Sequence, residues 1–174
     1  EQSFVGGIAI SPDGRYVYAV HVLGEALTML DVKSGLVRGT VDVGAEPYTC
    51  LMSRDGKTVF VSVWGGAKIL AFDAATLEKR GEVAVGEHPN AMVLSKDGAR
   101  LFVACANTNS VWVVDVASKT AKEQISVAAF SIAPPGATPN GLGLSPDGRT
   151  LLVANADNNA VAVVNVGDPA KSDV

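Results

Sequence analysis

The feature that most constrains this sequence is a repeat built on the tetrapeptide Ser-x-Asp-Gly. The tetrapeptide occurs four times, and successive serines are separated by 42, 42 and 50 residues. An aspartate or asparagine lies 20 residues after each serine, and a proline lies six residues before each of the last three. Because three anchors keep one register through four repeats, the chain is predicted to be an array of one structural unit. The anchors are Ser11, Ser53, Ser95 and Ser145; Asp31, Asp73, Asp115 and Asn165; and Pro47, Pro89 and Pro139, with Val5 in the first repeat.

Each repeat has the pattern of short β-strands. In the first repeat, apolar runs near residues 7–10, 15–21, 26–31 and 36–43 are bounded by glycine, proline or aspartate. Four short antiparallel strands in about 42 residues are the size of one propeller blade. The sequence therefore predicts an all-β chain, a β-propeller of four tandem four-stranded blades. Their predicted ranges are about 6–47, 48–89, 90–139 and 140–174, and the last blade is expected to be incomplete because few residues follow Asn165.

The Asp-Gly pair of each repeat predicts a turn between two strands. Glycine accepts positive φ without steric cost, and the aspartate side chain bonds back to nearby backbone. Gly98 is therefore expected to have positive φ, and its neighbour Asp97 to accept local hydrogen bonds. We interpret the repeated anchors as structural residues rather than as catalytic ones.

A family resemblance lies about ten residues after each serine. The segments Tyr18-Ala19-Val20-His21 and Leu152-Val153-Ala154-Asn155 resemble the Tyr-Val-Thr-Asn signature of YVTN β-propellers. This resemblance implies a ring of roughly seven blades, so that the chain would be a fragment of one. Residues 108–115, 134–140 and 154–163 resemble a bacterial subgroup in which the propeller precedes a phosphoesterase of the alkaline-phosphatase superfamily. The resemblance implies a periplasmic or extracellular protein, with the phosphoesterase metal ligands in a domain absent from these residues.

Composition limits the remaining possibilities. The formal net charge of −4 gives no electrostatic support for binding nucleic acid. No apolar run approaches the length of a membrane span. Only His21 and His88 could supply imidazole ligands, and residues 155–159 lack the glycine and terminal glutamate of a calcium loop, so no cofactor or metal is predicted. Cys50 and Cys105 fall on different strands of different blades, and we expect buried free thiols.

The parity of the strands assigns the candidate binding residues to one face. In antiparallel blades, the turns between second and third strands lie on the same side as the connections from one blade to the next. Propellers commonly bind ligands on that side, at the mouth of the central channel, where we expect a tentative binding face. The alternative is that its aromatic residues only pack. The candidate residues are Tyr48, Trp64, His88, Asn90, Asn107, Asn140 and Phe130.

The resulting functional prediction is a non-catalytic binding or scaffolding propeller, not an enzyme. The alternatives are part of a propeller enzyme, resembling a lactonase or a quinone-dependent dehydrogenase, and a structural repeat of a surface layer. Expected partners are another protein or the remaining propeller blades, with self-association through open blade edges as a further route. The third repeat has eight extra residues around 128–136. We expect this apolar, proline-containing loop either to cap its blade or to dock a partner.

Overall fold

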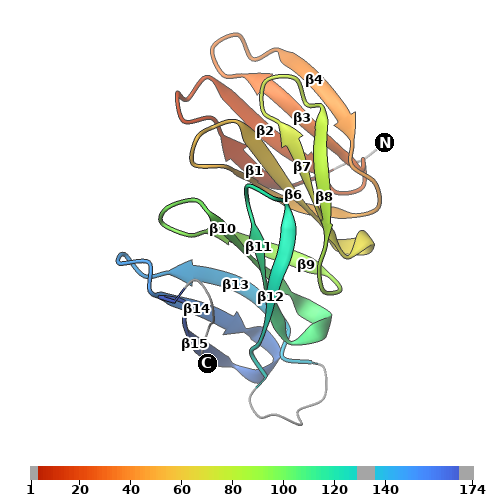
Figure 1. Ribbon diagram of the computed structural model, residues 1–174. Helices are drawn as coiled ribbons and strands as arrows, with labels where there is room; N and C mark the ends of the chain where they lie inside the picture. The colour runs from red at the N-terminus through yellow and green to blue at the C-terminus, as the bar shows by residue number, and fades with distance from the viewer. Residues whose placement is uncertain (1–3, 129–135, 169–174) are drawn as a thin grey trace.

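The computed structural model describes residues 4–128 and 136–168. These residues form four consecutive antiparallel sheets, blades 1 to 4, of which the last has three strands among the described residues (Figure 1). The strands are β1 (Val5–Ile10), β2 (Tyr16–His21), β3 (Ala26–Asp31), β4 (Val37–Asp42), β5 (Pro47–Met52), β6 (Thr58–Val63), β7 (Lys68–Asp73), β8 (Lys79–Ala84), β9 (Pro89–Leu94), β10 (Arg100–Cys105), β11 (Ser110–Asp115), β12 (Thr120–Ser126), β13 (Pro139–Leu144), β14 (Thr150–Asn155) and β15 (Ala160–Asn165). Short 3-10 turns η1 (Trp64–Gly66), η2 (Ala106–Thr108) and η3 (Ala156–Asn158) follow the second strands of blades 2, 3 and 4.

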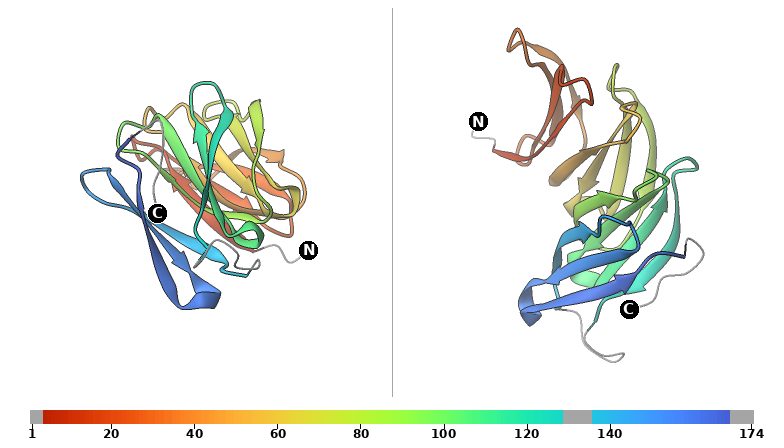
Figure 2. Two further views of the ribbon diagram at one scale, coloured as in Figure 1. Left: turned by 60° about the horizontal axis from the view of Figure 1, so that its bottom comes forward. Right: turned by 90° about the vertical axis from the view of Figure 1, so that its left-hand side faces the viewer.

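The blades are arranged as in a propeller. Within each blade the strands pair in sequence order, so the first strand forms one edge of the sheet. The first strands of successive blades, β1, β5, β9 and β13, lie against one another along the inside of an arc (Figure 2). The predicted all-β propeller fold, with four blades and a shorter last sheet, is confirmed.

The core lies between blades, in one apolar cluster at each of the three seams. Side chains on successive strand residues point to opposite faces of a sheet, so blades 2 and 3 each contribute one face to each of their two seams. An aromatic residue seven positions after the serine fills each seam from the preceding blade. These residues are Tyr18, Phe60 and Phe102, and each is at most 2% exposed.

The Ser-x-Asp-Gly turns are closed by the same hydrogen bonds in all four blades. In blade 3 the Ser95 hydroxyl donates to the Asp97 carboxylate over 2.5 Å, and the amide of Ala99 donates to that carboxylate over 3.0 Å. The Ser95 hydroxyl also accepts from the amide of Arg100 over 2.9 Å. Gly98 has φ of 75°, which confirms the predicted positive φ.

We expect Asp97→Ala to lower the free energy of unfolding by about 0.5–1.5 kcal/mol, since it removes these local bonds. Gly98→Val should cost more, because valine is strained at this φ and its Cβ would lie 2.8 Å from Cγ of Arg54. Thermal melts of the two variants test the ranking. Equal tolerance of both changes would contradict the role given to glycine.

The aspartate that ends the third strand of blades 1, 2 and 3 closes a second turn. The Asp31 carboxylate accepts from the amide of Ser34 over 2.9 Å and from the guanidinium of Arg38 over 3.1 Å. These bonds, first the one from the Ser34 amide, lower the pKa of Asp31 from its ordinary value to about 2. Asp73 and Asp115 close the same turn, and their pKa values are also lowered, chiefly by backbone amides.

The low pKa of Asp31 gives stability that depends on pH. Because the folded pKa lies below the unfolded value, the stabilisation is present above about pH 4 and is lost as the pH falls through about 2. Asp31→Asn does not titrate. The difference in melting temperature between the protein and this variant should therefore be constant near neutral pH and shrink on acidification. A difference that stays constant down to pH 2 would contradict the assignment.

Both cysteines are buried free thiols, as expected from the sequence. Burial raises the pKa of Cys50 and of Cys105 to about 12. Neither thiol is therefore ionised at neutral pH, and both act as small apolar core residues.

Candidate functional site

The candidate site lies on the face where second-to-third-strand turns meet the connections between blades. We call this the mouth face. Backbone hydrogen bonds lock the two sets of loops together: the amide of Trp64 donates to the carbonyl of Glu46 over 2.9 Å, and that of Ala106 to His88 over 3.1 Å. The backbone of Glu46 and that of His88 are both in the left-handed region, each with φ of 54°. The repeat thus fixes the backbone that presents these side chains.

Trp64 and His88 form a stacked pair at the seam between blades 2 and 3. Their ring centroids are 3.6 Å apart and the ring planes differ by 7°. Trp64 begins η1, and His88 directly precedes β9. The stack brings together two residues that the sequence analysis placed on this face, and it holds the indole in one orientation.

A small pocket also borders Trp64, at the seam between blades 1 and 2. It has a volume of about 190 Å³ and is lined by Val22, Glu46, Pro47, Tyr48 and Trp64. Tyr48 is 44% exposed, so its ring forms an open wall. The Glu46 carboxylate lies beside Gly65, where an added Cβ would meet Oε2 at 3.0 Å. Tyr48, Trp64 and Glu46 therefore line one apolar hollow, and the Glu46 carboxylate lies beside the adjoining Gly65.

The loops of the mouth face carry mostly negative charge, although Lys68, which begins β7, lies against Gly66 of η1 and pairs with Glu82. Its described loops, residues 22–25, 43–46, 64–67, 85–88, 106–109, 127–128, 136–138 and 156–159, contain no lysine or arginine in the sequence. They carry four carboxylates, those of Glu25, Glu46, Glu87 and Asp157. The turns on the opposite face mix bases and acids. The mouth face therefore favours cations over anions.

The structure separates the other predicted binding residues. Asn90 is 3% exposed, and its amide donates to the carbonyl of Pro139 over 3.0 Å, so it joins blades 3 and 4 rather than facing a ligand. Asn107 and Asn140 are exposed on the mouth face but do not line the pocket. Phe130 and the loop around it lie outside the described residues. Glu46 lines the pocket although the sequence prediction did not include it.

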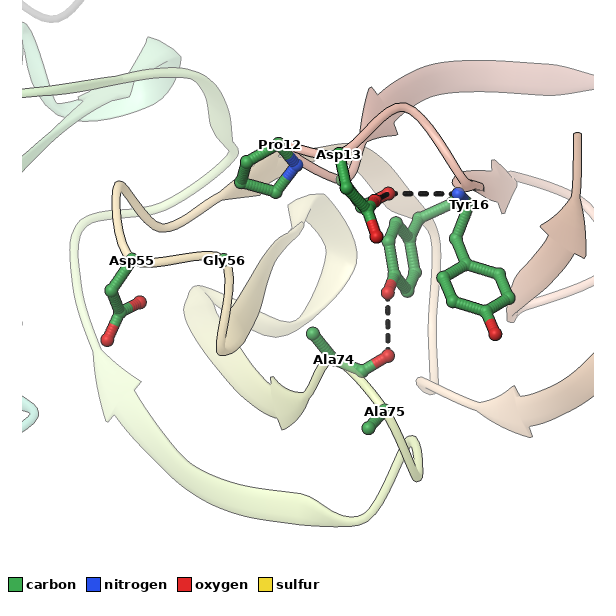
Figure 3. Close-up of a pocket in the computed structure, with 9 residues that line it drawn as sticks. Pro12, Asp13, Tyr16, Asp55, Gly56, Ala74 and Ala75 are labelled. Carbon is green, nitrogen blue, oxygen red and sulfur yellow. Dashed lines mark hydrogen bonds between the residues drawn. The ribbon is translucent and has the colours of Figure 1, made fainter.

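Larger cavities on the opposite face recur from seam to seam. The one between blades 1 and 2 has a volume of about 320 Å³, and its lining includes Pro12, Asp13 and Ala74 (Figure 3). Beside it the Tyr18 hydroxyl donates to the carbonyl of Ala74 over 2.6 Å. Similar cavities of about 340 Å³ lie at the next two seams. Because they repeat with the blades, we interpret them as a consequence of blade packing.

Comparison with known proteins identifies the family. The model of the cytochrome D1 heme domain matches residues 3–172, nearly the whole chain. The chain belongs to the cytochrome D1 heme domain family. No curated protein matches the sequence.

Two solved structures have the same fold as this cytochrome D1 heme domain. Kuenenia stuttgartiensis hydrazine synthase matches with a TM-score of 0.83 and 23% identity, over 94% of this chain and 46% of that one. A putative 6-phosphogluconolactonase from Bacteroides uniformis matches with a TM-score of 0.76 and 19% identity, over 94% of this chain and 51% of that one. The chain thus spans about half the length of each.

The family name implies a haem, whose fit to the mouth face depends on the ligands, the space and the charge that this face offers. Tyr48 and His88 are side chains of types that ligate haem iron. However, the pocket beside Tyr48 has a volume of about 190 Å³, too small for a macrocycle. The carboxylates of a haem are commonly met by basic groups, whereas the charged side chains within these loops are acids and the neighbouring Lys68 is paired with Glu82. The described residues of the mouth face do not fit a haem.

Within residues 4–128 and 136–168, no group of three or more histidine, cysteine, aspartate or glutamate residues is placed to hold a metal ion. Among the same residues, no helix is long and apolar enough to cross a membrane.

Proposed function

We propose that this cytochrome D1 heme domain relative is a non-catalytic binding module that takes a cationic, partly apolar group at its mouth face. The observation that carries the proposal is the pocket lined by Tyr48, Trp64 and Glu46, with the Glu46 carboxylate beside Gly65 of the adjoining turn. Aromatic faces attract cations by about 0.5–2 kcal/mol, and a nearby carboxylate adds to this attraction. Lysine side chains and alkylammonium groups have the required chemistry.

The proposal extends to the kind of protein that contains the module and to where it acts. The Tyr-Val-Thr-Asn-like segments support a YVTN propeller from an exported bacterial protein, acting in the periplasm or outside the cell. The proposed partner of the propeller within the same protein is a phosphoesterase domain. The acidic mouth face supports a protein partner that presents a basic side chain to it.

The two tryptophans of the chain allow a direct test of the pocket. Trp64 borders it, whereas Trp112 lies in blade 3, away from the pocket. Tetraethylammonium should shift the NMR signal of the Trp64 indole N–H in a saturable way and leave that of Trp112 unchanged. The neutral 3-ethyl-3-pentanol, of similar size, should bind more weakly because it lacks the charge.

Variants decide whether the carboxylate recognises the charge. Glu46→Gln should weaken tetraethylammonium binding several-fold. Glu25→Gln removes the same charge from the same face outside the pocket and should have a smaller effect. Equal shifts with the neutral alcohol, or equal effects of the two variants, would contradict a specific cation site. A titration with haemin provides the opposing test, since a saturable change in its visible spectrum that depends on His88 or Tyr48 would favour the haem function over the proposed one.

A further inference from the structure

The cavities on the face opposite the mouth differ in charge, although they recur from seam to seam. The described lining of the cavity between blades 1 and 2 has two carboxylates, Asp13 and Asp55, and no basic residue. The cavity between blades 2 and 3 has two acids and two bases in its lining. The cavity between blades 3 and 4 alone of the three has more bases than acids, and we call it the basic cavity. Its charged lining residues are Lys96, Arg100, Arg149, Asp97 and Asp147.

Arg100 is the residue that distinguishes this seam. It lies five positions after the serine, where the other blades have a tyrosine or a threonine. Its Nη2 donates to the carbonyl of Val166 in blade 4 over 2.7 Å, and its guanidinium lies over the ring of Phe102, 5.3 Å from the centroid. Its Nη1 is buried and has no hydrogen-bond partner in the described part of the chain. Because buried donors are normally met by a protein group, water or an ion, this guanidinium has donor capacity left over beside the cavity.

The charge of Arg149 is not offset as it is at the same repeat position of blade 1. There, Arg15 pairs with Asp31 over 3.8 Å, but Asn165 holds the position of Asp31 in blade 4. The side-chain oxygen of Asn165 accepts from the amide of Gly167 over 3.0 Å. Blade 4 therefore retains the base of the first repeat without the acid that pairs with it.

The remaining charges around the basic cavity leave it positive. Lys96 crosses from the blade 3 turn to Gly148, where an added Cβ would lie 3.1 Å from Cβ of the lysine. Among the described residues, none of the three bases forms an ion pair. Asp97 and Asp147 each accept from the serine hydroxyl of their own turn and from the backbone amide two residues further on. These bonds, first that of the serine, lower the pKa of both carboxylates, so three bases and two ionised acids leave one net positive charge.

We propose that the basic cavity is an anion site that takes a group carrying a carboxylate or a phosphate. Guanidinium groups bind the oxygens of both in pairs, and Arg100 is held beside the cavity by blade 4 and by Phe102. The cavity volume of about 340 Å³ is roughly ten times the volume of one water molecule in the liquid, so an organic group can accompany the oxyanion. This site lies on the face opposite the cation pocket and does not depend on it, so one module would bind groups of both signs.

An NMR titration with two named anions tests the site. Inorganic phosphate and succinate are added separately at constant pH, and the amide signals of Gly148 and Gly167, which line the basic cavity, are followed. At least one anion should shift both signals in a saturable way. Gly56 lines the acidic cavity between blades 1 and 2, so its signal is the internal control and should not move. Saturation by one anion alone identifies which of the two groups the site takes.

Variants separate a specific site from the general charge of this face. Arg149→Gln should weaken anion binding several-fold, whereas Arg15→Gln removes the same charge from the same repeat position of blade 1 and should have little effect. Arg100→Thr, which introduces the residue of blades 2 and 4, should weaken binding more than tenfold. Circular dichroism confirms the fold of each variant, and Arg149→Gln, at an exposed residue, decides the question if Arg100→Thr does not fold. The proposal is overturned if neither anion gives a saturable shift, if Gly56 shifts equally, or if Arg149→Gln and Arg15→Gln have equal effects.

Discussion

Replacing Phe102 with alanine is expected to lower the free energy of unfolding by about 3–5 kcal/mol. Phe102 is 0% exposed and fills the seam between blades 3 and 4 with Val111 and Val153. Its removal loses the transfer energy of a buried aromatic ring. It also leaves a cavity between two sheets that are held apart by their remaining side chains, so the seam cannot collapse fully.

The repeat supplies a matched control for this prediction. Leu152 holds the same repeat position in blade 4 but is 44% exposed, so Leu152→Ala should cost less than about 1 kcal/mol in the monomer. Urea unfolding at low protein concentration measures both variants. Blades that unfold separately would broaden the transition, so the unfolding of the seam itself should be followed by hydrogen exchange. Similar costs for the two variants would contradict the assignment of the seams.

Sequence reasoning predicted the fold because the features that determine it are local and repeated. The Asp97–Gly98 turn needs only a residue that accepts positive φ and a side chain that bonds to its own backbone. Alternating apolar residues define both faces of every strand, as in residues 58–63. Since the same anchors return in each repeat, one correct assignment fixes four blades.

The candidate site was predictable only in part, because its geometry depends on contacts between repeats. Tyr48, Trp64 and His88 were assigned to the correct face by strand parity. That Trp64 stacks on His88 and shares a pocket with Glu46 depends on how neighbouring blades approach each other. The spacing of residues within a single repeat does not predict the distance between side chains of neighbouring blades. The same limit explains why Asn90 was interpreted as a binding residue.

The mouth face favours the proposed cationic ligand, whereas the family name implies a haem. This difference has a physical basis. A propeller fold is fixed by its seams and turns, which place few constraints on the loops. Residues such as Glu46 and Trp64 lie in those loops, so they can change chemistry without changing the fold. Membership of the cytochrome D1 heme domain family therefore determines the arrangement of the blades, while the ligand depends on loop residues.

Asn90→Ala is expected to lower the free energy of unfolding by about 1–3 kcal/mol, the cost of leaving a buried polar group without its partner. Its side-chain amide is the donor to Pro139 in the next blade, and its side-chain oxygen accepts from the amide of Ala91 over 2.6 Å. Both bonds are buried or half-buried, so water cannot fully replace them. The loss should appear in urea unfolding, with tetraethylammonium binding at the mouth face unchanged.

Asn140→Ala is the matched control, because Asn140 holds the same repeat position and is exposed. In the monomer this change should cost less than about 0.5 kcal/mol. Equal costs for both variants at low concentration would show that the hydrogen bond to Pro139 contributes little. Loss of tetraethylammonium binding in Asn90→Ala, with stability retained, would instead indicate that Asn90 is a binding residue.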